Sequence, residues 1–229
     1  MTAWEAFVED FVTYGGYNTV IDGLIRTLYI AFGGLAIGIV IGTLIAVVKV
    51  VPSKNKFVGV LRKLCDIYVA LFRGIPMVVQ LLLFYFVIFA GTIPNIPTAI
   101  LAFGMNSGAY VSEIMRGGIQ SVDPGQLEAG RSLGLSYGRT MWNVVLPQSL
   151  KNILPTMGNE LIALVKETSV LSFIAVVDLT TAFKFIADAN YEYIIPYCML
   201  ALFYLVIVLI FTLLIRLLEK RMKKNERTH

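Results

Sequence analysis

The sequence predicts an all-α, polytopic membrane protein with five transmembrane helices, and three observations lead to this fold class. Of its 229 residues, 57% are hydrophobic and only 15% are charged, whereas about a quarter are charged in an ordinary soluble domain. Charge-free runs cover 28–48 and 193–215, and each is long enough to cross the hydrocarbon core of a bilayer. The basic residues gather in a few of the segments between the hydrophobic runs. The whole chain, 1–229, is therefore expected to form a single transmembrane domain.

The expected spans follow the hydrophobic runs in order. The first carries Gly34, Gly38 and Gly42, a smooth stripe that allows close helix packing, within the chain or in a dimer. The charge-free stretch 74–112 is broken in two by the pair of prolines in 91–97, because such a pair marks a tight reversal. The fourth and fifth spans follow a long polar segment and a short link with acidic residues. The five spans are approximately 22–50, 57–90, 97–116, 150–178 and 193–218.

The second span is too long to be one straight crossing. Its first part, 57–66, carries three charged residues and is expected to lie along the cytoplasmic interface. Gly74 and Pro76 are expected to bend or break the helix, since proline removes a bond from the helical ladder. Inside a membrane, protein or a water-filled cavity must satisfy the freed backbone groups. The segment is therefore either a cavity wall or a simple proline kink.

The basic residues predict the orientation of the chain. In a five-span arrangement 15 of the 19 lie on one side, which the positive-inside rule assigns to the cytoplasm together with the C-terminus. The N-terminus is then outside, and its first 23 residues, acidic and without Lys or Arg, do not resemble a cleaved signal. Six spans, with a split at 73–76, would separate the polar segment from the tail, so charge favours five. The 15 residues are Lys49, Lys54, Lys56, Arg62, Lys63, Arg116, Arg131, Arg139, Lys151, Arg216, Lys220, Arg221, Lys223, Lys224 and Arg227.

Several functional classes find no support. Cys65 and Cys198 lie far apart in apolar surroundings, which predicts packed thiols and neither a metal site nor a redox pair. The only histidine, His229, is the last residue, and no His, Cys or Ser arrangement points to a membrane-embedded enzyme. The net charge of +4 needs no nucleic-acid partner, because topology explains its placement. No Gly-x4-Gly-Lys-Ser/Thr motif is present, so any ATP hydrolysis must come from a partner chain.

The polar segment between 117 and 152 predicts two short helices at an angle. The first follows a turn at Pro124-Gly125, with Asp123 as a plausible cap, and it runs to Leu133 before Gly134 interrupts. The second starts at Ser136 and closes at Leu146-Pro147. Their apolar and aromatic side chains suit docking into a groove on another protein. The alternative is a pair of amphipathic helices on the lipid headgroups.

This polar segment resembles the EAA loop of permease subunits in binding-protein-dependent ATP-binding-cassette (ABC) importers. The residues that carry the resemblance are Glu128-Ala129-Gly130, Gly134 and Leu146-Pro147. The surrounding sequence narrows the resemblance to the polar amino-acid uptake group, and it extends from about residue 20 to 220. The matching segments are 23–28, 72–81, 110–119, 125–129, 146–148 and 166–169.

The resemblance implies the type I ABC importer permease fold and a coupling role for the loop. In the family, the coupling helix sits in a cleft of an ATPase subunit, which carries ATP and Mg²⁺, and nucleotide-driven closure of two ATPases moves the spans. A transporter then contains two permease chains, identical or different, two ATPases and an external substrate-binding protein, in the cell membrane of a prokaryote. Gly130 replaces the family's usual second alanine, so the first helix is expected to end early. The implied coupling residues are Glu128, Ala129, Gly130, Arg131, Leu133, Gly134, Leu135, Leu146 and Pro147.

Ionisable residues inside the spans are candidates for a substrate path. Glu160 and Glu167 share a face of the fourth span and cannot both be buried unpaired, so a protein cation such as Lys166 or a cationic substrate must neutralise one. Relatives often have an uncharged residue at the Glu160 position, and a carboxylate there resembles the family members that transport basic amino acids. Glu160 is thus expected to bind the side chain of arginine, lysine or histidine, with a structural ion pair as the alternative. The substrate-binding candidates are Glu160, Asn159, Asn106, Ser107, Gln80 and Glu113, although structural bonding is preferred for Glu113 and for the Lys166–Glu167 pair.

The predicted function is the membrane-spanning subunit of an ATP-driven importer that moves a polar, basic amino acid by alternating access. Such a subunit is not itself an enzyme and needs no cofactor or metal of its own. The alternative is a secondary transporter or channel driven by an ion gradient, with the polar segment as a lipid-facing hairpin. Nothing resembling an inverted repeat is visible in the sequence, which weakens this alternative.

Overall fold

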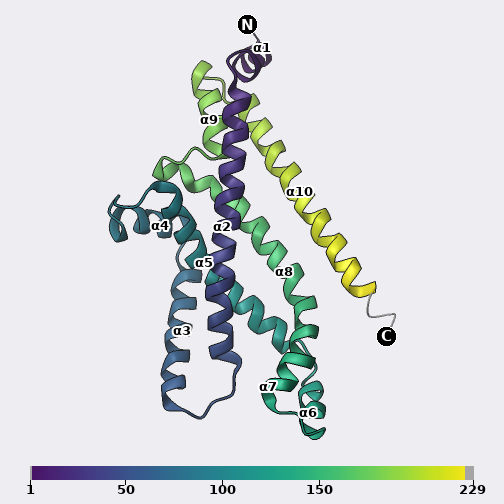
Figure 1. Ribbon diagram of the computed structural model, residues 1–229. Helices are drawn as coiled ribbons and strands as arrows, with labels where there is room; N and C mark the ends of the chain where they lie inside the picture. Colours follow the sequence, from purple (N-terminus) through teal and green to yellow (C-terminus); the bar gives the residue numbers. More distant parts are fainter. Residues whose placement is uncertain (1, 225–229) are drawn as a thin grey trace.

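The computed structural model describes residues 2–224, and within that range the chain forms helices and turns with no strand. Two of the residues named above, Arg227 and His229, lie outside the described range. The helices form an elongated bundle in which α2 runs along most of the length (Figure 1). The elements are α1 (Ala3–Val8), η1 (Glu9–Thr13), α2 (Gly16–Val50), α3 (Lys56–Gly74), α4 (Met77–Leu82), η2 (Leu83–Ile88), α5 (Asn95–Gln120), α6 (Pro124–Ser132), α7 (Tyr137–Thr140), η3 (Met141–Val145), α8 (Leu146–Glu167), η4 (Thr168–Ile174), α9 (Leu179–Asn190) and α10 (Ile194–Lys224).

Two helices of the described chain, α2 and α10, are long and apolar enough to cross a membrane, and two bent helix pairs raise the number to as many as four. The all-helical fold class is thus confirmed, whereas the five-span count and the orientation stay predictions. The expected third span corresponds to α5, which is not among these candidates. Its centre carries Asn106, Ser107 and Ser112, all buried within the chain. A helix enclosed by other helices has little need of an apolar surface toward lipid.

The glycine stripe on α2 packs inside the chain, against α5. A Cβ atom at Gly34 would lie 2.9 Å from the Cβ of Phe103, and one at Gly42 would lie 2.6 Å from Val111. Close approach of the two helices therefore depends on the missing side chains. In the other direction, Gly104 of α5 receives Ile37 of α2. The packing that the spacing predicted is confirmed as intramolecular.

The expected second span is broken at Ile75-Pro76, as its sequence predicted. α3 and the α4–η2 segment meet at 106°, and α4 projects sideways from the bundle (Figure 1). Residues 57–66 belong to one continuous helix, α3, which runs from Lys56 to Gly74, and their expected place along the cytoplasmic interface stays a prediction. The guanidinium of Arg62 donates to the backbone carbonyls of Val48 and Val51, and these bonds tie the start of α3 to the end of α2.

The helix that contains most of the expected fourth span, 150–178, begins before residue 150 and ends before residue 178. A continuous helical rod runs from Tyr137 to Ile174, and α9 follows it at an angle of 54° after Ala175, whose φ is +56°. The second loop helix thus does not close at Leu146-Pro147. Pro147 lies at the start of α8, and the wider π-helical turn η3, which joins α7 to α8 in front of it, accommodates a residue without an N–H within the continuous helix.

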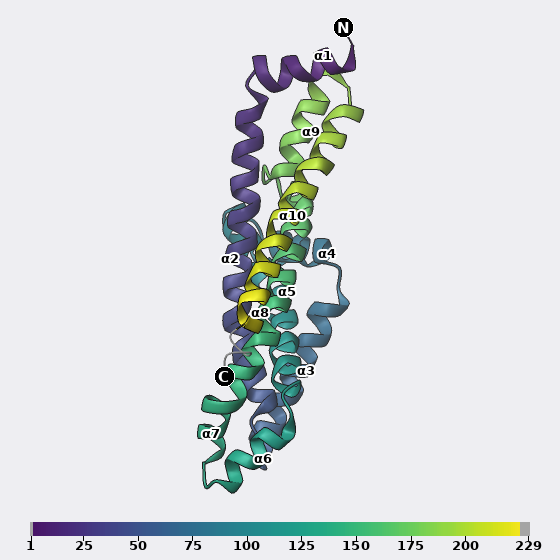
Figure 2. The ribbon, with the colours of Figure 1, turned by 90° about the vertical axis from the view of Figure 1, so that its right-hand side faces the viewer.

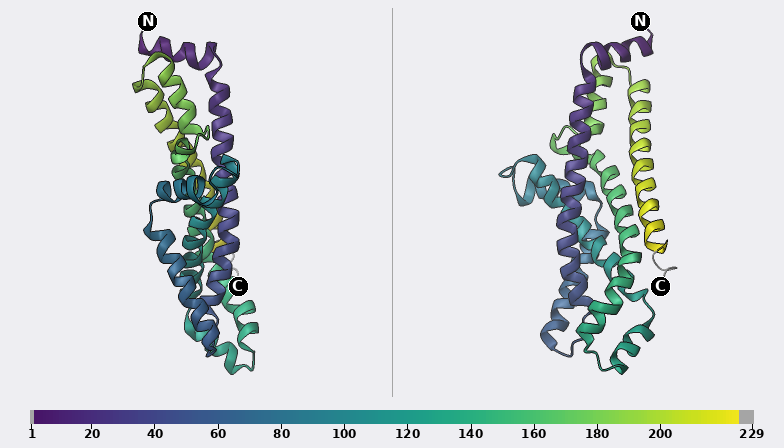
Figure 3. Two further views of the ribbon diagram at one scale, coloured as in Figure 1. Left: turned by 90° about the vertical axis from the view of Figure 1, so that its left-hand side faces the viewer. Right: turned by 45° about the vertical axis from the view of Figure 1, so that its right-hand side comes forward.

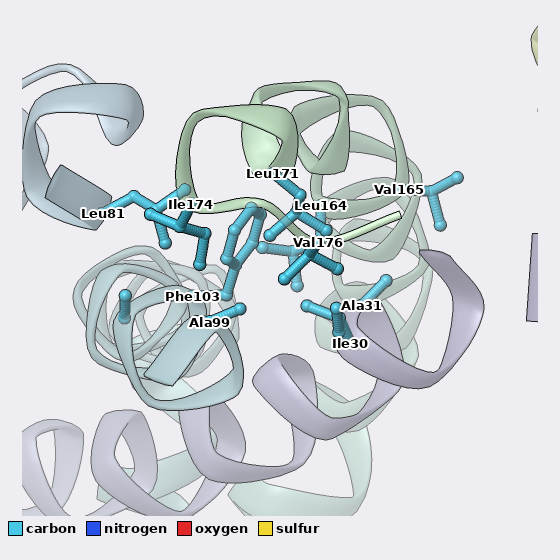
Figure 4. Packing of buried hydrophobic residues seen from close by; sticks show 11 residues of the cluster. Ile30, Ala31, Leu81, Ala99, Phe103, Leu164, Val165, Leu171, Ile174 and Val176 are labelled. Atoms are coloured by element: carbon cyan, nitrogen blue, oxygen red, sulfur yellow. The ribbon is translucent and has the colours of Figure 1, made fainter. Parts of the chain in front are cut away.

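The core lies where α2, α4, α5 and α8 meet the 3₁₀ turn η4. Phe103 of α5 points into its centre, toward Leu164 and Leu171 (Figure 4). Asn95 closes one edge of the core by donating from its side chain to the carbonyl of Ile174 at 2.6 Å. This core holds the broken end of α8 against α5, and the functional candidates lie on these same two helices.

The basic segments gather at one end of the bundle. The α2–α3 connection and the α6–α7 loop lie at the lower end in Figure 1; α10 descends toward this end but stops higher up, beside α8, whereas α1 and α9 lie at the upper end. This is the grouping that the charge pattern predicted. We refer to the lower end as the basic end.

Candidate functional site

Gln80 of α4 is the central residue of a buried polar cluster beside the helix break. Its side chain is only 3% exposed, and its Nε2 donates to the carbonyls of Phe72 at 2.8 Å and Ile75 at 2.7 Å. Those carbonyls lie at the end of α3, where the bend removes the backbone amides that would otherwise donate to them. Gln80 therefore holds the break in place, and an apolar pocket of about 200 Å³ lies against it.

The same amide links the break to α5. Gln80 Nε2 also lies 3.2 Å from Oδ1 of Asn106, a residue that is 4% exposed. The other atom of the amide, Gln80 Oε1, is buried and has no hydrogen-bond partner in the described chain. A buried acceptor without a partner costs roughly 1–3 kcal/mol, and such groups in native structures call for an explanation, a functional role among them.

A second polar contact, between Ser107 and Glu160, joins α5 to α8. The Ser107 hydroxyl donates to Oε1 of Glu160 at 2.9 Å. Ser107 is itself fully buried against α2, where a Cβ atom at Gly38 would lie 2.7 Å from its Oγ. The glycine stripe of α2 thus sets the position of the hydroxyl that binds the carboxylate.

Glu160 is partly buried and forms no ion pair with any cation in the described chain. The expected protein cation, Lys166, is exposed and, within that part of the chain, forms no close ion pair with Glu160 or Glu167, although its charge acts on Glu167. Asn159, next to Glu160, is exposed. Of the two expectations for Glu160, the structural ion pair is absent from the described chain.

Glu113 lies elsewhere, in an ion network at the basic end. It pairs with Lys49 of α2 at 2.8 Å and with Arg116 at 2.6 Å, and Lys49 also contacts Asp66 of α3 at 2.8 Å. The structural bonding that was preferred for Glu113 from the sequence is what the structure shows. Tyr110, one turn before it, faces Arg73, whose guanidinium lies 5.2 Å from the ring centre.

The loop residues form two angled helices, as predicted. Asp123 caps α6 by accepting from the amide of Gly125, and Ser136 caps α7. Gly134 between them has a φ of +82°, which suits glycine. Pro124 and Gly125 are part of α6, and the helix does not end early at Gly130 but runs to Ser132.

Gly130 is the contact point between the two loop helices. It is buried, and a Cβ atom there would lie 2.4 Å from Cγ2 of Thr140. The departure from the family's alanine therefore has a packing reason, which the contact across the loop reveals and the sequence spacing does not. The remaining coupling candidates divide by exposure: Glu128, Ala129, Arg131, Leu133, Gly134 and Pro147 are exposed, whereas Leu135 and Leu146 are partly buried.

An apolar surface is presented by these helices. Leu133 is 83% exposed and Trp142 is 73% exposed. A groove of about 380 Å³ is lined by Trp142, Leu146, Pro147 and Leu150. Exposed apolar surface of this kind marks an interaction site.

Sequence reasoning assigned no role to the motif at 23–28, and the structure supplies one. Thr27 is fully buried and accepts from the backbone N–H of Leu179 at 3.2 Å, and a Cβ atom at Gly23 would lie 2.6 Å from the carbonyl of Asp178. Together they hold the start of α9 against α2. The four-residue spacing of a glycine and a threonine on one face was the signal that could have predicted a close contact.

The fold and site define a helical membrane component with a buried polar cluster near its centre and an exposed apolar loop at its basic end. The chain belongs to the family described as binding-protein-dependent transport system inner membrane components, which matches residues 18–224. This confirms the ABC importer permease family predicted from the loop and the surrounding motifs.

Individual relatives are permeases for amino acids. The chain is 36% identical over 210 residues to the arginine transport system permease protein ArtQ of Bacillus subtilis, covering 90% of this chain and 94% of that protein. It is 35% identical over 209 residues, with the same coverage, to a putative glutamine transport system permease protein GlnP of Rickettsia typhi. A crystal structure of an amino acid ABC transporter with histidines matches with a TM-score of 0.83 and 41% identity, covering 93% of this chain and 97% of that one.

Proposed function

We propose that this chain is the membrane-spanning subunit of an ATP-driven importer for a basic amino acid, with Glu160 as the group that binds the cationic side chain. The observation that carries the proposal is the Glu160 carboxylate, fixed by Ser107 yet without a protein cation in the described chain. A partly buried charge needs a partner, and the side chain of arginine, lysine or histidine supplies one. The relative named for arginine transport and the amino acid transporter structure with histidines support this substrate class, whereas the relative named for glutamine transport supports a neutral one.

Gln80, Asn106, Ser107 and the exposed Asn159 provide the neutral polar groups of the proposed site. The first three are joined through hydrogen bonds to one another or to Glu160. Gln80 Oε1 adds a buried acceptor without a partner in the described chain, suited to an ammonium or guanidinium donor. Since Gln80 also holds the α3–α4 break, substrate contact and helix geometry are connected through one side chain.

Energy is proposed to enter through the loop. The exposed side chains of α6 and α7 dock into a partner ATPase that carries ATP and Mg²⁺, and the rod from Tyr137 to Ile174 carries Glu160. A force on the loop therefore acts on the substrate site through a continuous helix. The complete transporter contains two permease chains, two ATPases and an extracytoplasmic binding protein, as the family resemblance implies, and it lies in the cell membrane of a prokaryote.

The proposal is tested by uptake into proteoliposomes that contain the complete transporter and its binding protein. Glu160→Gln is expected to raise the KM for arginine and lysine by about tenfold or more, because a hydrogen bond to a charged group contributes roughly 1.5–3 kcal/mol. Glu219→Gln, a carboxylate near the end of α10, is the matched control and leaves the KM unchanged. Unaltered uptake of both substrates by Glu160→Gln would contradict the cation site, and uptake that needs an ion gradient and no ATP would contradict the importer.

A further inference from the structure

The first helix lies across the end of the bundle opposite the basic end. α1 and η1 run roughly perpendicular to α2, over the ends of α9 and α10 (Figures 2 and 3). Phe7 is 4% exposed, and together with Phe11 it packs in one cluster with Phe183 and Ile186 of α9. One face of α1 therefore anchors it to the bundle.

A second face of this helix is apolar and uncovered. Trp4, Val8 and Val12 recur at four-residue spacing and are 56%, 36% and 58% exposed. They form a stripe beside the anchoring face, and we call these three residues the α1 stripe. Glu5, which precedes Phe7 by about half a helical turn, is exposed on the side opposite the anchoring face. Glu9 is partly buried and accepts a hydrogen bond from the hydroxyl of Tyr14. The helix therefore has an anchoring face, an apolar flank and, at Glu5, a charged outer face.

Exposed aromatic side chains with polar tips gather at the same end. Besides Trp4 they come from two other places in the chain, the start of α2 and the α9–α10 connection. They are Tyr14 at 73% exposure, Tyr17 at 42%, Tyr191 at 83%, and Tyr193 and Tyr197 at 41% each. Trp and Tyr favour the membrane–water interface, because the ring prefers the apolar side and the polar tip remains in water.

We propose that α1 and η1 form an interfacial helix, with the α1 stripe inserted between the lipid headgroups on the side of the membrane opposite the basic end. The occupant is lipid because the stripe lies at the level of this aromatic belt. In addition, the neighbouring helix α10 exposes apolar side chains over much of its length, Leu202, Leu205 and Leu209 among them. A helix with an apolar flank and a charged outer face is suited to lie in the plane of the interface. The proposal depends on membrane insertion alone and is independent of the substrate.

Spin labels test this placement in the complete permease–ATPase complex, reconstituted in vesicles of phosphatidylethanolamine and phosphatidylglycerol. Single labels are attached to Val8→Cys, Val12→Cys and Glu5→Cys in a background with Cys65→Ala and Cys198→Ala, and Leu209→Cys on α10 is the lipid reference. Collision rates with oxygen, which concentrates in lipid, and with a water-soluble nickel chelate are measured by electron paramagnetic resonance. The oxygen-to-nickel ratio at positions 8 and 12 is expected to be several-fold higher than at position 5 and to approach that at 209.

Two results would overturn the proposal. A ratio at positions 8 and 12 equal to that at position 5 would place the α1 stripe in water. Low collision rates with both reagents would place it under protein, either a second permease chain or, if they fall only after the binding protein is added, that protein. Since Val8 and Val12 are exposed, the labelled variants should retain uptake, and only variants that do so are compared.

Discussion

At the scale of single residues, local chemistry determines where this chain can tolerate change. Gly130 shows this most clearly, because its family position favours alanine and its own surroundings exclude it. Helix propensity alone favours alanine over glycine by roughly 1 kcal/mol. The 2.4 Å separation between a Cβ atom and Thr140 Cγ2 outweighs that gain, because overpacking costs about 1–3 kcal/mol.

Gly130→Ala is therefore expected to lower the melting temperature of the purified complex and to weaken coupling between ATP hydrolysis and uptake. Gly130→Ala combined with Thr140→Ser should recover most of the loss, because serine lacks the Cγ2 methyl group. Gly138→Ala, at a position with open space around its Cβ, is the control. A Gly130→Ala variant as stable as the parent would show that α6 and α7 separate without cost.

Two acidic residues of the ion network at the basic end, Glu113 and Asp66, differ in their exposure and in their partners. The side chain of Glu113 is 20% exposed and contacts both Lys49 and Arg116, whereas that of Asp66 is 61% exposed and contacts Lys49 alone. Exposed ion pairs contribute at most about 1 kcal/mol, while loss of one partner from a more buried network costs more.

Glu113→Gln is expected to destabilise the protein clearly more than Asp66→Asn, as measured by thermal unfolding of the complex in detergent. Neither substitution should change which amino acid is carried, because neither residue contacts the Gln80–Glu160 cluster. If Glu113→Gln changed the KM for arginine while stability stayed intact, Glu113 would again be a candidate for substrate binding.

At the scale of helices, the contact between α2 and α5 decides the position of the substrate candidates. Gly38 touches Ser107, and Ser107 binds Glu160. A residue of α2 thus acts on the cluster without contacting a substrate.

Gly38→Ala is expected to raise the KM for substrate and to lower stability by about 1–3 kcal/mol, because the new Cβ atom meets the Ser107 hydroxyl at 2.7 Å. Gly59→Ala on α3, where nothing lies within 4 Å, should leave both properties unchanged. Uptake kinetics and thermal unfolding check the pair. A loss of stability without any change in KM would separate the glycine stripe from the substrate site.

At the scale of the whole molecule, the proposed route of energy runs from the exposed loop to the centre of the bundle. Leu133 and Trp142 offer apolar surface at the basic end and contribute little to the fold, since most of each side chain is exposed. Their replacement should therefore separate docking from folding.

Trp142→Asp and Leu133→Asp are each expected to reduce co-purification of the ATPase and to abolish ATP-driven uptake, with the permease still folded and inserted. Phe57→Asp is the matched control, because Phe57 is also at the basic end and 72% exposed but lies outside the loop. Pull-down of the ATPase with the three variants decides the outcome. Normal ATPase capture by both loop variants would contradict the docking surface.

Much of the site could be predicted, because membranes restrict where polar groups occur. The polar candidates Gln80, Asn106, Ser107 and Glu160 were chosen as polar residues within apolar spans, and the structure joins them as two hydrogen-bonded pairs, Gln80–Asn106 and Ser107–Glu160, at neighbouring positions of α5. The break at Ile75-Pro76 followed from the chemistry of proline. The second loop helix was predicted wrongly to close at Leu146-Pro147. The helix continues through Pro147 because the π-helical turn before it accommodates the missing N–H, and the sequence pattern did not reveal this turn.

The sequence by itself determined the helical fold class, the family, the gathering of basic residues and the chemistry of the candidate groups. These depend on residue type and on spacing along the chain. Only the tertiary structure decided that Glu113 belongs to an ion network while Glu160 does not, that Gly130 meets Thr140, and that α1 lies across the bundle. Each of these is a contact between residues far apart in the chain or on different helices, and the packing of whole helices, which no local pattern encodes, brings them together.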